Sequence, residues 1–146
     1  MRDPKDETVI SGRVVALDYG SGRCGVAVSD PTGTLATPLD AVARPATRKG
    51  FNRLLAAIRE HDPVLVLVGL PISLSGADTA QTTETREFAR RLAGFVDVPV
   101  ELHDERFTTR MAQQRAGSAA EDSRAAAVLL EGWLDRESRF GPDRAI

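Results

Sequence analysis

The chain has little cysteine and no long apolar run, and each shortage excludes a class of protein. Cys24 is the only cysteine among 146 residues, so internal disulfide bonds are excluded and a reducing compartment is expected. No run of about 18 apolar residues occurs, and the polar first 12 residues have no apolar core, so we expect neither a membrane span nor a signal peptide. These shortages predict a cytoplasmic protein with no membrane partner.

The charge balance also limits the choice of partner. Lys and Arg number 19, Asp and Glu number 21, and the formal net charge is -2, so the chain as a whole does not attract nucleic acid. Any contact with a polyanion must be local. The length fits one domain with one core, which we place at residues 13–137 between a disordered leader at 1–12 and a flexible tail at 138–146.

The most informative stretch is RVVALDYGSGRCGVAVSD, which begins at Arg13. It predicts two apolar strands joined by a turn in which Gly20 and Gly22 allow a positive φ, with Asp18 where the first strand ends. Asp18 is open to two interpretations. It is either a turn carboxylate that accepts hydrogen bonds from nearby N–H groups, or a metal ligand or catalytic acid on a rigid strand end.

The remaining periodicity predicts an α/β fold. After the opening hairpin, apolar patterns predict further elements in this order: a strand at Leu35–Ala43, a helix within Arg44–Arg59, a buried strand at Pro63–Gly69, a helix at about Thr79–Val96, a strand at Val98–His103, a short helix through Met111 and Gln114, and a last helix from Ser118 to about Arg136. Pro38 places the third strand at an edge. Short right-handed connections then give a five-stranded mixed sheet, order 3-2-1-4-5, flanked by helices.

Two further acidic clusters would reach the same edge of this sheet. Glu105 follows the fifth strand beside Asp104, and Asp122 lies in the first turn of the last helix. Taken singly, these acids are adequately explained as turn or helix-capping groups. Together they form a candidate site, because the ends of strands one and five lie roughly 10 Å apart, a width that suits two divalent cations. Asp18 and Glu105 could bracket the pair for phosphodiester hydrolysis, with Asp122 reaching over from the helix.

Four motifs in order resemble one known family. LDYGSGRCGVAVSD, VGLPISLSG, DERFTT and EDSRAAAVLLEGWL are similar to the YqgF family, bacterial ribonuclease-H-like proteins described as Holliday junction resolvases or as nucleases that process the 5′ end of pre-16S ribosomal RNA. The resemblance covers about residues 13–135. It implies a nuclease that uses Mg²⁺ or Mn²⁺, with Asp18, Glu105 and Asp122 as catalytic and metal-binding acids. We assign the other polar residues of the family motifs to substrate contacts: Arg23, Arg106, Thr108 and Thr109.

The chain departs from the family pattern in two places. Only Arg110 to Glu121 separates the TT motif from the last acid, a stretch that is longer and more basic in typical members. The fourth strand ends in Gly69-Leu70-Pro71, whereas better-known ribonuclease-H-like nucleases carry an acid there. Whether Asp104 or Glu105, and Glu121 or Asp122, are the ligands stays open.

The resemblance leaves the substrate and the assembly open. The expected partner is nucleic acid, either pre-ribosomal RNA, with ribosomal precursor particles as a further partner, or branched DNA. The alternatives to an RNA-processing nuclease are a Holliday junction resolvase and a catalytically weak nucleic-acid-binding module for ribosome assembly. The sequence is compatible with a monomer or a homodimer.

Overall fold

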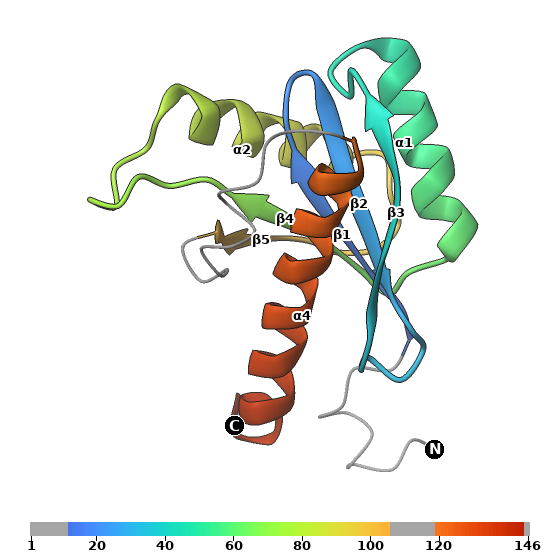
Figure 1. The fold of residues 1–146 in the computed structure, drawn as a ribbon, viewed down its shortest axis with the longest axis vertical. Helices are drawn as coiled ribbons and strands as arrows, with labels where there is room; N and C mark the ends of the chain where they lie inside the picture. Colours follow the sequence, from blue (N-terminus) through green and yellow to red (C-terminus); the bar gives the residue numbers. More distant parts are fainter. Residues whose placement is uncertain (1–11, 106–118, 145–146) are drawn as a thin grey trace.

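A computed structural model describes residues 12–105 and 119–144, with a five-stranded sheet at the centre (Figure 1). Its strands are β1 (Val14–Tyr19), β2 (Arg23–Ser29), β3 (Ala36–Ala43), β4 (Leu65–Leu70) and β5 (Val100–Asp104). The strand order is β3-β2-β1-β4-β5, with β1 antiparallel to β2 and parallel to β4. The predicted order and the edge position of the strand that contains Pro38 are both confirmed.

Helices cover both faces of the sheet. They are α1 (Arg48–His61), α2 (Ala80–Ala93) and α4 (Ala119–Arg144). The apolar faces of α1 and α2 pack on one side of the sheet, against β1 residues such as Leu17. The apolar stripe of α4 packs on the other side, against Val14, Ala16 and Leu67. Alternate residues of β1 therefore face different helices, which explains why this strand is apolar along almost its whole length.

Some helix ends differ from the sequence prediction. α1 begins only after Thr47, whose side chain accepts a hydrogen bond from Gly50 N (3.1 Å), and α2 ends at Ala93 before Gly94. α4 continues in helical form to Arg144, into the stretch predicted to be a flexible tail. The short helix predicted through Met111 and Gln114, and the leader apart from Gly12, lie outside the described residues.

The turn of the opening hairpin does not use the positive φ angles that Gly20 and Gly22 allow. Among the described glycines, positive φ occurs at Gly12, Gly33 and Gly76, and so not at Gly20 or Gly22. Four residues lie between the paired Tyr19 and Cys24, and turns of this length are usually built on right-handed geometry.

An irregularity in β2 provides the docking point for α4. The pairing of β2 with β3 shifts register between Cys24 and Val26, and Val26 N donates a hydrogen bond to Ser123 Oγ of α4 (3.2 Å). Ser123 is 1% exposed, so this hydroxyl satisfies a backbone donor that water cannot reach. The bond fixes the first turn of α4 against β2.

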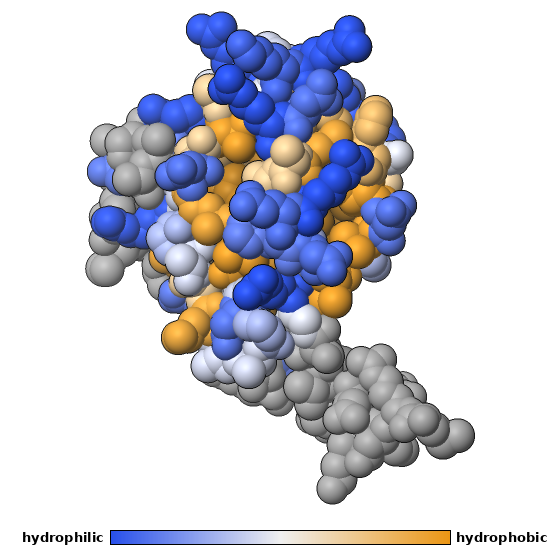
Figure 2. All heavy atoms as spheres, turned by 90° about the vertical axis from the view of Figure 1, so that its right-hand side faces the viewer, coloured by the Kyte–Doolittle hydropathy of each residue, from blue (hydrophilic) through white to orange (hydrophobic). Residues whose placement is uncertain are grey.

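The surface around α1 is mixed in character. Figure 2 shows this side of the molecule, with hydrophilic side chains over its upper end and along its middle and hydrophobic surface on both sides of them. The exposed α1 residues include Arg48, Lys49 and Arg53, as expected for the outer face of a helix. No helix among the described residues combines the length and apolar composition that crossing a bilayer requires.

Replacing Ser123 tests the link between α4 and β2. Ser123→Ala leaves the buried Val26 N–H without its acceptor, so we expect the free energy of unfolding to fall by about 1–3 kcal/mol in urea titrations. Ser21→Ala, at an exposed position in the β1–β2 turn, is the control. Equal stability of the two variants would contradict this role.

Candidate active site

Asp18 is flanked by glycine on both neighbouring strands. It pairs with Gly25 of β2, and Gly69 of β4 follows directly after the pair formed by Leu17 and Val68. Strand alternation directs Asp18 to the same side of the sheet as Ala16, the side that α4 covers. The two positions beside Asp18 therefore carry no side chain. This leaves space for groups that arrive from outside the three strands.

Glu105 occupies the space over Gly69. It comes directly after β5, and a Cβ added to Gly69 would lie 2.9 Å from its Oε1 and 3.1 Å from its Cγ. Glu105 thus reaches across β4 and forms a side-chain hydrogen bond with Asp18. The predicted placing of strand four between strands one and five is confirmed, and the two side chains nevertheless come into hydrogen-bond contact. The reason is that Gly69 places no side chain between them.

The first turn of α4 occupies the space over Gly25. A Cβ at Gly25 would overlap the backbone carbonyl of Asp122 and would lie 2.8 Å from Ser123 N. The Asp122 side chain accepts a hydrogen bond from Arg23 Nε (2.9 Å), and the pair is partly exposed, at 39% for Arg23 and 25% for Asp122. Asp122 is also close enough for its charge to act on Asp18.

Burial and mutual repulsion raise the pKa values at this site. Burial, and to a lesser extent the charge of Asp122, raise the pKa of Asp18, although its hydrogen bond with Glu105 acts in the opposite direction. Burial first, then the charge of Asp18 and their hydrogen bond, and last the charge of Asp104, raise the pKa of Glu105 to about 8. Asp18 and Glu105 therefore share a proton near neutral pH.

The buried thiol of Cys24 is affected by the charges of the same acids. Burial raises the pKa of Cys24 far above its usual value, and the negative charges of Asp18 and Asp122 add to the effect. Cys24 is therefore a protonated core residue.

The donor chemistry of the site fits a hard divalent cation. Asp18, Glu105 and Asp122 supply carboxylate oxygens, the ligands that Mg²⁺ and Mn²⁺ prefer. In residues 12–105 and 119–144, no set of three or more His, Cys, Asp or Glu side chains is already arranged to hold a metal. Here Asp18 and Glu105 bond to each other and Asp122 bonds to Arg23, so these side chains must exchange partners when a cation binds.

The structure places four of the seven predicted site residues. It brings together Asp18, Glu105, Asp122 and Arg23, whereas Arg106, Thr108 and Thr109 lie outside the described residues. The sequence prediction missed the part that Gly25 and Gly69 play. Their position inside apolar strands was the available signal, because an isolated strand glycine often marks the close approach of another group.

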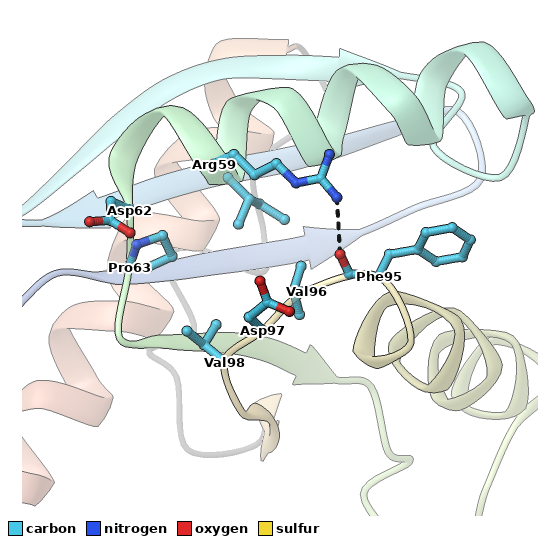
Figure 3. Close-up of a pocket in the computed structure, with 8 residues that line it drawn as sticks. Arg59, Asp62, Pro63, Phe95, Val96, Asp97 and Val98 are labelled. Atoms are coloured by element: carbon cyan, nitrogen blue, oxygen red, sulfur yellow. Dashed lines mark hydrogen bonds between the residues drawn. The ribbon is translucent and has the colours of Figure 1, made fainter.

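One cavity among the described residues lies away from these acids. It has a volume of about 180 Å³ and is lined by Pro63 and Val98, which precede β4 and β5, at the end of the sheet opposite Asp18 (Figure 3). Arg59 Nη2 donates to Phe95 O across it (3.1 Å), which ties the end of α1 to the segment after α2. Arg59, one of the basic residues of the Arg44–Arg59 segment, thus has a structural role.

The close approach of α4 at Gly25 can be tested by adding a methyl group there. Gly25→Ala forces α4 away from β2, so we expect a loss of about 1–3 kcal/mol in the free energy of unfolding, as is typical of overpacking. Gly22→Ala is a matched control, because a Cβ there meets nothing within 4 Å. A Gly25→Ala protein as stable as Gly22→Ala would refute the close approach.

The shared proton predicts a specific dependence of stability on pH. Because the pKa of Glu105 is raised on folding, its contribution is fully present below about pH 4.5 and is lost as pH rises through about 8. We expect the free energy of unfolding, measured in EDTA from pH 5 to 9, to fall with pH. In Glu105→Gln the fall should be smaller by at least about 1.4 kcal/mol, the equivalent of one pKa unit.

The exposed Glu60→Gln on α1 is the control for this titration and should follow the unmodified protein. Parallel curves for Glu105→Gln and the unmodified protein would contradict the shared proton.

Comparison with known proteins assigns the family. The profile of the RuvX family, described as Holliday junction resolvase, matches residues 12–136. A relative from Clavibacter michiganensis is 40% identical over 140 residues, covering 89% of this chain and 87% of the relative. One from Mycobacterium leprae is 43% identical over 147 residues, covering 92% and 78%. Both carry the name "Putative pre-16S rRNA nuclease".

Solved structures agree in fold at low sequence identity. RuvC of Thermus thermophilus, in complex with a Holliday junction substrate, has a TM-score of 0.55 and 16% identity and covers 86% of this chain and 96% of its own. The yeast mitochondrial Holliday junction resolvase Ydc2 has a TM-score of 0.58 and 11% identity and covers 94% and 83%. The sheet order, the fold and the sequence relatives lead to one conclusion: this chain belongs to the RuvX family, which its motifs resemble under the name YqgF.

Proposed function

We propose that this protein is a divalent-metal-dependent nuclease that hydrolyses phosphodiester bonds and processes the 5′ end of pre-16S ribosomal RNA. The observation that carries the proposal is the convergence of Glu105 and Asp122 on Asp18 over two strand glycines. Three carboxylates from different parts of the chain meet here, and burial together with a neighbouring negative charge raises the pKa values of Asp18 and Glu105. Such an arrangement costs stability, and costly charged clusters are typical of functional sites. The names of the sequence relatives support the RNA substrate.

Asp18, Glu105 and Asp122 would hold Mg²⁺ or Mn²⁺. When bound, such cations activate a water molecule and stabilise the leaving oxygen of a phosphodiester. Asp18 lies on β1, Glu105 directly follows β5 and Asp122 lies on α4, so the sheet and one helix position the ligands together. Before a cation binds, Asp18 and Glu105 must give up their shared proton, and Asp122 must leave Arg23.

Arg23 then becomes available to the substrate. Its guanidinium is partly exposed and lies at the start of β2, 2.9 Å from Asp122. If Asp122 served as a metal ligand, the Arg23 guanidinium would be released to donate to a phosphate oxygen, which it binds in a well-directed geometry. This exchange of partners explains how a chain with net charge -2 and an acidic site can bind a polyanion.

The family description favours a second substrate. RuvX is described as Holliday junction resolvase, and a four-way DNA junction presents the same phosphodiester chemistry. Both substrates therefore belong in one experiment. A protein that binds RNA and cleaves neither substrate would instead be a nucleic-acid-binding module.

The proposal predicts metal-dependent cleavage that requires Asp18. Purified protein should cleave a labelled pre-16S leader RNA with Mg²⁺ or Mn²⁺ and lose activity in EDTA. Asp18→Asn should lower the cleavage rate by roughly 100-fold or more, because one charged ligand oxygen is lost. Its free energy of unfolding should stay equal or rise, since the amide removes a buried charge.

Glu60→Gln, an exposed carboxylate change on α1, is the matched control and should retain full activity. A four-way DNA junction tested in parallel identifies the preferred substrate. If the folded protein cleaves neither substrate at saturating metal, the nuclease proposal is wrong.

A further inference from the structure

The loop after β4 displays an apolar side chain to solvent. Leu74 is 93% exposed, more than the other large exposed hydrophobic residues among the described ones, which are Leu35 (67%), Phe95 (53%) and Val64 (44%). Single exposed apolar residues are common on protein surfaces and by themselves need no explanation. Leu74 differs because of how its loop is built and where it lies.

The loop holds Leu74 in a defined turn. Gly76 N donates to Ser73 O (2.8 Å), and Gly76 has a φ of 88°, a conformation that suits glycine. The Ser73 side chain donates to Ala77 O (3.0 Å) and accepts from Ala77 N (3.1 Å). At the base of the loop, Thr82 Oγ1 of α2 bonds to Pro71 O. Leu74 is therefore the outward residue of a hydrogen-bonded turn that is anchored to α2.

The turn lies at the edge of the sheet that carries the acids. The loop begins at Pro71, two residues after Gly69, the residue over which Glu105 reaches Asp18. In Figure 1 it projects outward from the tip of β4, beyond the side where β5 also ends. A polymer whose phosphate lies at Asp18 must extend past neighbouring loops of this edge. Leu74 is the most exposed large apolar residue among the described ones, and its loop follows the strand end at this edge.

We propose that Leu74 is a wedge that inserts between adjacent bases of the bound nucleic acid, separates them and bends the strand toward the carboxylates. The inference rests on the proposed function, since it takes the substrate to be a nucleic acid. Base faces are the large apolar surfaces of such a substrate, and apolar side chains inserted at base steps unstack and kink nucleic acids. Leu74 acts as a positioning residue and does not touch the reacting phosphate.

The loop carries no charge that would repel a nucleic acid. Residues 70–77 carry no ionisable side chain, in contrast to the acids beside them. The next acid, Asp78, lies 3.5 Å from Arg86 Nη2 and is thereby partly neutralised. A polyanion can thus approach the turn without the repulsion that unpaired acids would produce.

The wedge can be tested without cleavage. The probe is 2-aminopurine, a fluorescent base that brightens when it is unstacked, placed next to the scissile position in the pre-16S leader RNA and in a four-way DNA junction. Both are bound to Asp18→Asn protein. We expect a fluorescence rise on binding, reduced about threefold or more by Leu74→Ala and kept by Leu74→Phe, because insertion needs apolar bulk. The slope of log Kd against log salt should not change, because a wedge forms no ion pair.

Leu35→Ala is the matched control. It removes the same side chain from another exposed position, next to the turn after β2 at the opposite edge of the sheet, and should leave the fluorescence rise unchanged. If Leu74→Ala and Leu35→Ala give equal fluorescence on both substrates, the wedge proposal is wrong. The fluorescence experiment does not require catalysis, so failure of the nuclease proposal and failure of the wedge are separate results.

Discussion

The site depends on the close approach of two acidic side chains to a third that is buried in a sheet. Asp18 lies on an interior strand, where neighbouring strands stand about 4.8 Å apart and normally fill the space with side chains. Gly25 and Gly69 remove those side chains on both flanks, and the space is taken by the Asp122 backbone on one side and the Glu105 carboxyl on the other. A methyl group at either glycine would meet the incoming residue.

This arrangement concentrates negative charge in a poorly hydrated place. The protein limits the cost by a proton shared between Asp18 and Glu105 and by the ion pair of Asp122 with Arg23. Both the shared proton and the Arg23–Asp122 ion pair can be exchanged for another partner. A proton can leave as pH rises or a cation binds, and Arg23 is exposed enough to change partner. A cluster of carboxylates that is held together by a proton and an ion pair is typical of a site that binds a positively charged ligand.

α4 couples the core to the site. Its apolar stripe covers one face of the sheet through residues such as Leu130 and Trp133, and its first turn supplies Ser123 to β2 and Asp122 to Asp18. A change that loosens the core on this face will also move a carboxylate. Glu105 is different, because it follows an edge strand, and its position depends on the length of β5 and on the empty space over Gly69.

The sequence by itself determined the elements and their order. Apolar runs, Pro38 and the short connections were enough for the strand order, and the four motifs were enough for the family, because both depend on local pattern along the chain. Helix ends were less certain: α2 ends at Ala93, before the predicted Val96, and α4 extends past Arg136 although its polar tail gave no such sign.

Only the tertiary structure decided how the acids meet. Local pattern predicted that Asp18, Glu105 and Asp122 lie at one edge, with the ends of strands one and five two strand spacings apart. It did not show that the Asp18 and Glu105 side chains form a hydrogen bond. Glu105 can reach Asp18 because Gly69, which lies between them, has no side chain. This matters only in the folded protein, where β5 lies beside β4. For the same reason Arg23 could be assigned to substrate from its motif, whereas its pairing with Asp122, 99 positions further along the chain, required the folded molecule.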